Sequence, residues 1–379
     1  MSILCLLSVL ALTSTGTDPG WLESAEVCNG WYQQWTDETI APMRDIPFVI
    51  GVPLDKEVIE KAHKQGTRVL AYVTFYQMPP GQVYQGEDLA KHPDWNVIKP
   101  DGSIGISCFE GTENTGWKTV CPNSPSFRKY ALKLTRSLMD LGVDGLFIDN
   151  GHPDEICEAP KFGRHKHLYP GKDNIYAYRK LLEDVRAEVR RHGGDKIVIV
   201  NPGEPRKEWV GACDGQMLES YICTWAADHR WHDEARLLEF QKAWAPVVDQ
   251  GIAVVALSYI GHTKNPPRED AYYCYAWARL SGFIWADWFT AKDCAKALYK
   301  LRLGKATGPM TPCTGYYMRE FEHGAVVVSS ESRGASFRLS AKDHPRVLDL
   351  FAAKHLKPGP SGDYEIALDK GQGRVYLYH

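Results

Sequence analysis

The sequence of 379 residues lacks the features that mark several large protein classes. No stretch approaches the ~18 apolar residues that a membrane-spanning helix needs. The formal charge of −3 leaves no basic excess for nucleic acid or anionic lipid. Ten cysteines, none spaced as C-x-x-C, are too few for a disulfide-built scaffold and do not form a zinc-ribbon pattern. We therefore expect no nucleic-acid partner and no integral membrane segment.

Three familiar catalytic or cofactor motifs are also absent. No G-x-G-x-x-G follows the first predicted strand, so a Rossmann dinucleotide site lacks its main signal. The P-loop pattern G-x-x-x-x-G-K-[ST] does not occur. The G-x-S-x-G elbow is missing as well, which argues against a serine enzyme of the α/β-hydrolase type.

The one apolar run near the amino terminus is short. Residues 3–12 read ILCLLSVLAL and are followed by small and polar residues. This length fits the apolar part of a secretory signal, although no Lys or Arg precedes Arg44. A buried strand or a misassigned start codon is the alternative. We expect a signal peptide over residues 1–17 and a secreted or periplasmic protein.

Eight short apolar runs recur along the chain, and most of them are followed by a helical pattern. Runs such as IVIV and IAVVAL are continuously apolar, as expected for parallel strands buried on both faces. The predicted strands are 27–33, 47–51, 68–75, 145–149, 196–201, 216–219, 252–259 and 283–288. Helices with capping signals are predicted between them, at 55–65, 124–141, 173–192, 233–250 and 267–280.

This alternation predicts an α/β fold, a closed (β/α)8 TIM barrel over residues 27–307. A doubly wound open sheet is the structural alternative. From about residue 308 the pattern changes to short runs rich in Val, Tyr and Phe, with a hairpin turn at His323-Gly324. We therefore expect a small antiparallel, β-sandwich-like domain over residues 308–379.

Two acids follow apolar strands at the end where barrel enzymes carry their active groups. Asp149 comes after Leu146-Phe147-Ile148, and Glu219 comes after Met217-Leu218. A carboxylate there is costly to bury unless it is paired or used. The two could provide the acid/base or acid/nucleophile pair that glycoside hydrolysis needs. The alternative is a structural acid that caps a helix or binds Arg, and Glu204 is a rival partner.

Polar and aromatic residues at the same strand ends are candidates for substrate binding. Aromatic residues make up 11% of the chain, and flat rings with a few polar groups suit sugar. Many of these rings are expected to be core residues instead. The predicted substrate-binding residues are Tyr76, Asn150, Asn201, Tyr221, Trp225, Tyr259 and Asp287.

The predicted loop after Asp149 holds metal-capable side chains. His152, His165 and His167 lie there with Cys157, but without a zinc spacing such as H-E-x-x-H. A polar active-site lid is favoured over a metal site, and we expect no cofactor. A metal-dependent barrel hydrolase built on the three histidines is a further alternative.

Two segments resemble known barrel glycoside hydrolases. The segment from Gly142 to Asp149, preceded by Asn123-Ser124-Pro125, resembles the region around their fourth strand, and Leu218-Glu219-Ser220-Tyr221 resembles the strand-six acid of the endo-α-1,4-polygalactosaminidase group, glycoside hydrolase family 114. The resemblance implies that Asp149 is a nucleophile or stabilising carboxylate and that Glu219 is the general acid/base. We therefore predict a two-carboxylate glycosidase acting on an oligo- or polysaccharide. A catalytically silent glycan-binding barrel is the alternative from a different class.

Overall fold

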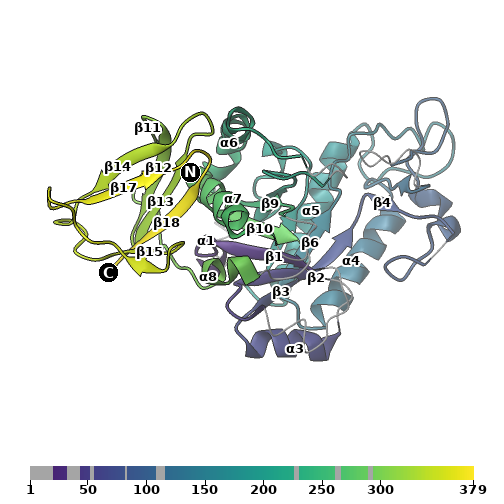
Figure 1. Ribbon diagram of the computed structural model, residues 1–379. Coiled ribbons are helices and arrows are strands. Elements are labelled where there is room, and N and C mark those ends of the chain that lie inside the picture. Colours follow the sequence, from purple (N-terminus) through teal and green to yellow (C-terminus); the bar gives the residue numbers. More distant parts are fainter. Residues whose placement is uncertain are drawn as a thin grey trace, which may run out of the picture.

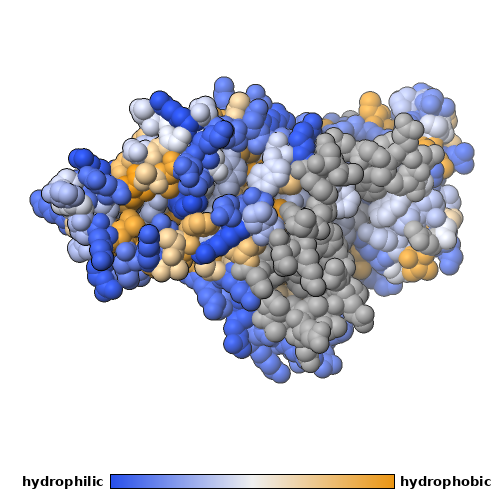
Figure 2. Space-filling model, viewed as in Figure 1, coloured by the Kyte–Doolittle hydropathy of each residue, from blue (hydrophilic) through white to orange (hydrophobic). Residues whose placement is uncertain are grey.

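The computed structural model describes residues 20–31, 43–51, 55–81, 83–107, 116–225, 230–260, 266–288 and 293–379. The predicted signal peptide lies outside these ranges, so export stays a prediction. Within the described ranges no helix is long and apolar enough to cross a bilayer. Figure 2 shows hydrophilic side chains interspersed with smaller apolar patches over the coloured part of one face.

Eight parallel strands close into a barrel, as predicted (Figure 1). In chain order they are β1 (Val27–Trp31), β2 (Phe48–Gly51), β3 (Arg68–Thr74), β6 (Gly145–Asp149), β7 (Ile197–Val200), β8 (Gly215–Leu218), β9 (Ala253–Ser258) and β10 (Ile284–Trp288). Each strand pairs with its neighbours in this order, and β1 pairs with β10, with Val27 opposite Trp285. That last pairing leaves no open edge and excludes the open sheet.

Alternate side chains of the strands fill two separate cores. One set, which includes Leu70, Phe147 and Ile199, packs inside the barrel. Their chain neighbours, such as Leu146 and Val198, belong to the larger core between the strands and the helices. This period of two fixes which strand-end residues point into the mouth of the barrel.

The five predicted helices all form. They are α3 (Lys56–Lys64), α4 (Pro125–Met139), α5 (Asn174–Arg191), α6 (Glu234–Val248) and α7 (Arg268–Ser281). Side-chain caps begin four of them: Asp55, Ser124, Asp173 and Asp233 each accept a hydrogen bond from the backbone N–H three residues later. Shorter helices are α1 (Gly20–Glu23), α8 (Lys296–Tyr299), η2 (Leu89–Lys91), η3 (Pro93–Trp95), η4 (Lys207–Trp209) and η5 (Asp293–Ala295).

Two long connections extend the carboxyl side of the barrel. The first follows β3 and contains the small antiparallel pair β4 (Gln77–Met78) and β5 (Lys118–Thr119). The second, residues 150–173, joins β6 to α5. Figure 1 shows β4 on the side of the barrel away from the carboxyl-terminal strands. Hydrogen bonds join the two connections, for example from Glu158 N–H to Ile98 O at 2.7 Å.

The carboxyl-terminal residues form the predicted antiparallel sheets. A six-stranded sheet has the order β11 (Thr311–Cys313), β12 (Tyr316–Phe321), β13 (Gly324–Ser329), β18 (Gly373–Tyr378), β15 (Val347–Asp349) and β16 (Lys354–His355). The strands β14 (Ala335–Leu339) and β17 (Tyr364–Leu368) make a second, two-stranded sheet. The predicted hairpin forms between β12 and β13, where Phe321 pairs with Gly324.

One face of the six-stranded sheet packs against the barrel and the other against β14 and β17. Val326 and Val328 of β13 belong to the same core as the barrel helices, whereas Val327 packs with Phe337 and Ile366. The sheet lies directly beside α7, as Figure 1 shows. The barrel and the carboxyl-terminal sheets therefore share one continuous apolar core.

Candidate active site

Four neighbouring strands bring four polar side chains to one sector of the barrel mouth. Asp149 is the last residue of β6, and Asn201, Glu219 and Tyr259 directly follow β7, β8 and β9. These strands are consecutive in the barrel. The residues two positions earlier, Phe147, Ile199, Met217 and Leu257, all pack inside the barrel. Alternation therefore directs the four polar side chains inward, above that apolar layer.

A single amide joins the two acids. The side-chain nitrogen of Asn201 donates to Asp149 Oδ1 at 2.8 Å and to Glu219 Oε2 at 2.7 Å. The two carboxylate oxygens that share this nitrogen are therefore at most 5.5 Å apart. Both acids thus lie against the same amide at the mouth of the barrel. Asn201 itself is buried.

Each acid also accepts a hydrogen bond from a tyrosine. The Tyr72 hydroxyl donates to Asp149 Oδ2 at 2.6 Å, and the Tyr259 hydroxyl donates to Glu219 Oε1 at 2.5 Å. Asn150 adds a donor to Asp149 Oδ2 at 3.2 Å. Among the described residues, no Arg or Lys forms an ion pair or hydrogen bond with either acid. The described partners of this pair of carboxyl groups are therefore neutral donors.

The pKa of Glu219 is raised above its ordinary value. Burial is the largest cause and the nearby charge of Asp149 is the second, while hydrogen bonds from Tyr259 and Asn201 oppose the shift. Burial and the Glu219 charge also raise the pKa of Tyr259, so its hydroxyl keeps the proton that it donates. Glu219 is thus suited to hold a proton, while three donors surround the Asp149 carboxylate.

The residue after each acid has a left-handed backbone. Asn150 has φ +52° and Ser220 has φ +57°, a conformation that residues other than glycine adopt infrequently. Such outliers cluster at functional sites because the surrounding structure holds them there. In both cases the turn ends the strand immediately beyond the acid and begins the loop that rises from the mouth.

The loop after Glu219 brings an aromatic side chain to the mouth. The backbone N–H of Trp225 donates to Ser220 Oγ at 3.1 Å, and the Trp225 ring makes an edge contact with Tyr259 at a centroid distance of 5.7 Å. Trp225 is 52% exposed, so much of this indole is open to solvent. Tyr259 therefore connects the solvent-facing ring to the Glu219 carboxylate.

Five of the seven predicted substrate-binding residues lie in or beside the mouth, and two lie elsewhere. Asp287 follows Ala286, which packs inside the barrel, so its own side chain points outward. There it contributes to raising the pKa of Cys274 on α7. Tyr221 is buried, and its hydroxyl forms a hydrogen bond with Ser281 at 2.9 Å. Neither residue joins the two acids.

Tyr76 has a position at the edge of this arrangement. Its hydroxyl accepts a hydrogen bond from Glu155 N–H at 3.4 Å, and its ring lies against His152 and Tyr178. Because Tyr76 is buried, it supports the loop after Asp149 and offers little surface to a ligand.

Tyr72 was not among the predicted site residues. It lies within β3, whereas the predicted residues lie where strands end. The alternation of β3 could have identified it. Leu70 packs inside the barrel, so Tyr72, two residues further along, also points inward. A polar aromatic at such a position near a mouth is a candidate partner for a strand-end acid.

A second cluster of functional side chains lies in the long connections. Cys121, Cys157, His165 and His167 have their sulfur and nitrogen ligand atoms within 4.8 Å of one another. His152 is not among them, so the structure separates the three histidines that were considered together. The cluster gains a cysteine from another loop instead.

Comparison with known proteins agrees with the barrel and with the predicted class. Residues 51–150, about a quarter of the chain, match the family described as GHL6, hypothetical glycosyl hydrolase 6. This segment contains Asp149. Among curated proteins, nothing matches the chain.

Several solved structures share the fold at low sequence identity. The glycoside hydrolase domain of PelA from Pseudomonas aeruginosa is 19% identical, with a TM-score of 0.50 over 70% of this chain and 96% of that chain. The α-amylase from Geobacillus thermoleovorans is 10% identical, with a TM-score of 0.59 over 95% of this chain and 99% of that chain. The α-glucosyl transfer enzyme XgtA is 10% identical, with a TM-score of 0.61 over 95% of this chain and 99% of that chain.

These findings bear out the prediction of a TIM-barrel glycoside hydrolase. The solved structures support the fold, and the family match supports the class. Assignment to family 114, and the roles of Asp149 and Glu219, stay predictions.

Proposed function

We propose that this protein is a retaining glycoside hydrolase in which Asp149 is the nucleophile and Glu219 is the general acid/base. The observation that carries the proposal is the Asn201 side chain, which donates to both carboxylates from one nitrogen. The two oxygens that share this nitrogen are at most 5.5 Å apart, which supports direct attack by one acid over attack by an intervening water molecule. Carboxyl groups about 5–5.5 Å apart are typical of retaining enzymes, whereas inverting enzymes separate them by about 6.5–9.5 Å.

The different surroundings of the two acids support these roles. Burial and the Asp149 charge raise the pKa of Glu219, which favours the protonated form that a general acid needs. Asp149 accepts hydrogen bonds from Tyr72, Asn201 and Asn150, which fix the position of its carboxyl group beside Glu219.

In the first step, Asp149 attacks the anomeric carbon while Glu219 gives its proton to the leaving glycosidic oxygen. The bond from carbon to the leaving oxygen breaks, and a glycosyl ester forms on Asp149. In the second step, Glu219 takes a proton from water. The water oxygen attacks the same carbon and releases Asp149, so the product keeps the configuration of the substrate.

The substrate that we propose is an oligo- or polysaccharide. Trp225 presents an exposed ring beside Tyr259, and Trp231 in the same loop region is 40% exposed. Exposed aromatic faces next to acidic and amide groups suit the apolar faces and hydroxyls of sugar rings. Trp225→Ala should raise KM roughly tenfold with kcat little changed, because stacking is a binding interaction. Trp225→Phe, which keeps a ring, is the matched control.

The test of the reaction is a screen of the purified protein against α- and β-linked oligosaccharides. Proton NMR of the first product formed should show the same anomeric configuration as the substrate. The Glu219→Gln protein is the control for contaminating activity. Inversion of configuration would contradict the retaining mechanism, and full activity in either Asp149→Asn or Glu219→Gln would contradict the assignment of the acids.

A silent glycan-binding barrel is less well supported. In such a protein the acids would be neutralised by Arg or Lys or would face different cavities. Within the described part of the chain, neither carboxylate has a cationic partner, and both contact Asn201.

A further inference from the structure

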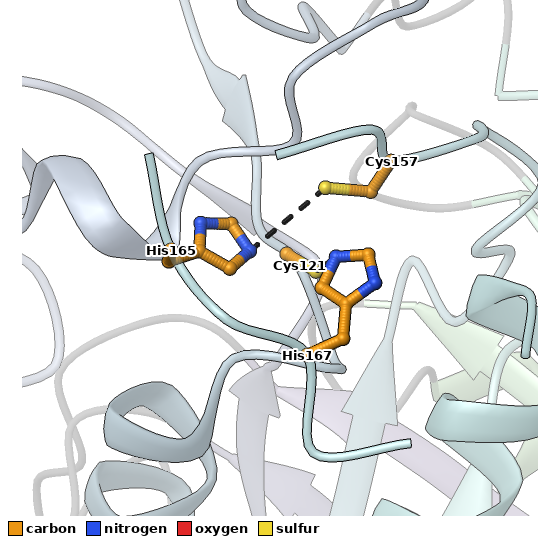
Figure 3. Close-up of side chains that lie close together, drawn as sticks. All are labelled: Cys121, Cys157, His165 and His167. Carbon is orange, nitrogen blue, oxygen red and sulfur yellow. Dashed lines mark hydrogen bonds between the residues drawn. The ribbon is translucent and has the colours of Figure 1, made fainter. Parts of the chain in front are cut away.

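Two loops far apart in the sequence bring two cysteines and two histidines together. Cys121 lies between β5 and α4, while Cys157, His165 and His167 lie in the connection from β6 to α5. Figure 3 shows the four side chains turned toward a common centre, with the contact between Cys157 and His165 drawn as a dashed line. Cys121 is buried and the other three are partly buried.

The distances fit one tetrahedral ion. Cys121 Sγ lies 3.7 Å from His167 Nε2, and Cys157 Sγ lies 3.9 Å from His165 Nε2. All four ligand atoms lie within 4.8 Å of one another. A tetrahedral zinc site with Zn–S near 2.3 Å and Zn–N near 2.0–2.1 Å has ligand-to-ligand edges of roughly 3.3–3.8 Å. The distances of 3.7 and 3.9 Å lie at the upper end of this range, and a separation at the 4.8 Å bound would have to shorten by about 1 Å to complete the site.

Neighbouring groups hold these ligands in place. The Ile98 N–H donates to Cys157 Sγ at 3.5 Å, and the Cys121 thiol lies 3.8 Å from Asn174 Oδ1 at the start of α5. Leu168 N–H, one residue after His167, donates to Asn123 O at 2.9 Å. Outer contacts of this kind orient metal ligands in known sites.

We propose that Cys121, Cys157, His165 and His167 bind one structural Zn²⁺ ion. Two thiolates and two imidazoles in tetrahedral arrangement are typical of zinc. Four protein ligands fill the coordination shell, so no position remains for water or substrate. The ion is therefore structural, and the chemistry stays with Asp149 and Glu219.

The ion would fasten the loop that begins directly after the nucleophile. That loop starts at Asn150, which donates to Asp149, and from residue 150 to 173 it contains no helix or strand. Its other attachments are mostly polar, such as Asn174 Nδ2 to Glu155 O at 2.6 Å and Arg206 to Asp154 at 2.7 Å. A bound ion can replace the apolar core that such a loop lacks.

Metal analysis of the full chain tests the proposal. The protein is incubated with ZnCl₂ and desalted to remove unbound metal. Inductively coupled plasma mass spectrometry should then find one zinc ion per chain. His165→Ala and Cys157→Ser should each lower bound zinc at least tenfold. The control variants Cys313→Ser and His355→Ala, which change the same residue types outside the cluster, should keep it.

Two further measurements separate zinc from a disulfide and from misfolding. Thiol titration should show Cys121 and Cys157 reduced, and more reactive after chelation by dipicolinate. Because Cys can replace His as a zinc ligand, His167→Cys should retain the ion, which a general defect in folding would not allow. Chelation should also lower Tm in the wild type and leave Tm of Cys157→Ser unchanged.

Three results would overturn the proposal. The first is zinc below one tenth of an equivalent in folded wild-type protein after the ZnCl₂ treatment. The second is a disulfide between Cys121 and Cys157. The third is zinc content that His165→Ala and Cys157→Ser leave unchanged.

Discussion

The strands β6 and β8 each carry an acid at both ends, and the two ends differ. At the amino ends, Asp144 and Asp214 precede Gly145 and Gly215 and each accepts a backbone N–H from a neighbouring strand, Val69 or Val198, at 2.8 Å. Both also contact basic side chains. Asp144 pairs with His63 at 2.7 Å, and Asp214 pairs with Arg186 and Arg190 at 2.8 and 2.7 Å.

At the carboxyl ends, the same strands place Asp149 and Glu219 beside each other, and no Arg or Lys of the described ranges pairs with either acid. Tyrosine hydroxyls and one shared amide replace the arginines. An acid that is paired with Arg stabilises the fold, whereas two acids that face one another oppose ionisation and retain a proton. The acids at the two ends of these strands therefore differ in their partners, and under the proposed function this difference separates structural from catalytic carboxyl groups.

The largest expected effect is a loss of activity when the acid at the carboxyl end of β6 or β8 is replaced. Asp149→Asn and Glu219→Gln should each lower kcat on the order of 10⁴-fold, because each removes a group that takes part in bond formation or proton transfer. Steady-state rates on the oligosaccharide found in the screen measure this loss. Circular dichroism should show that both variants keep the folded structure. A fall in kcat of less than tenfold in both variants would contradict the proposed difference between the amino and carboxyl ends of β6 and β8.

The next effect is on stability, at the amino end of β8. Asp214→Asn leaves Arg186 and Arg190 beside a neutral side chain and should lower the free energy of unfolding by about 3 kcal/mol. Urea unfolding measures this change. The kcat of the folded variant should stay within about twofold of the wild type. A large fall in kcat at unchanged stability would contradict the structural role.

A smaller effect is expected from the shared amide. Asn201→Ala removes a donor from both carboxylates and should lower kcat on the order of 10²-fold. Because the hydrogen bond from Asn201 lowers the pKa of Glu219, its loss should raise that pKa further. The alkaline limb of the kcat/KM profile should therefore move to higher pH. A shift to lower pH would show that Asn201 does not act through Glu219.

The smallest effect concerns stability and pH. The pKa of Glu219 is raised in the folded protein, so folding favours its protonated form, and stability falls as pH rises from the ordinary glutamate range through the raised pKa. Glu219→Gln lacks this penalty. The Tm of the variant relative to wild type should therefore be higher at pH 7 than at pH 4. A relative Tm that is equal at both values or lower at pH 7 would exclude the raised pKa.

Much of the fold follows from the sequence because its signals are local. Continuous apolar runs predict the eight strands, and caps such as Asp173 and Ser124 predict where helices begin. The short strands β11, β15 and β16 were missed. Each has two or three residues and includes polar or proline residues such as Pro312 and His355, so no periodicity can appear.

The site is less predictable because it depends on whether each strand residue points into or out of the barrel, and on contacts between distant parts of the chain. Asp149, Asn201, Glu219 and Tyr259 follow from the rule that active groups lie at strand ends. Asp287 follows the same rule but has the outward phase, which a one-residue difference in the strand decides. The cysteine and histidine cluster was not predicted in this form, because Cys121 is 36 residues before Cys157, on a separate loop.

The continuous core has a consequence for dissection of the protein. Ten of the fourteen residues of α7 are buried, because the barrel covers one side of this helix and the carboxyl-terminal sheet covers another. Arg319 of β12 donates to the carbonyls of Arg279 and Leu280 at the end of the same helix. Truncation near residue 307 would therefore uncover an apolar helix with unsatisfied carbonyl groups. The six-stranded sheet therefore forms a structural part of the barrel domain. Recombinant protein should contain the barrel and the carboxyl-terminal sheets on one polypeptide.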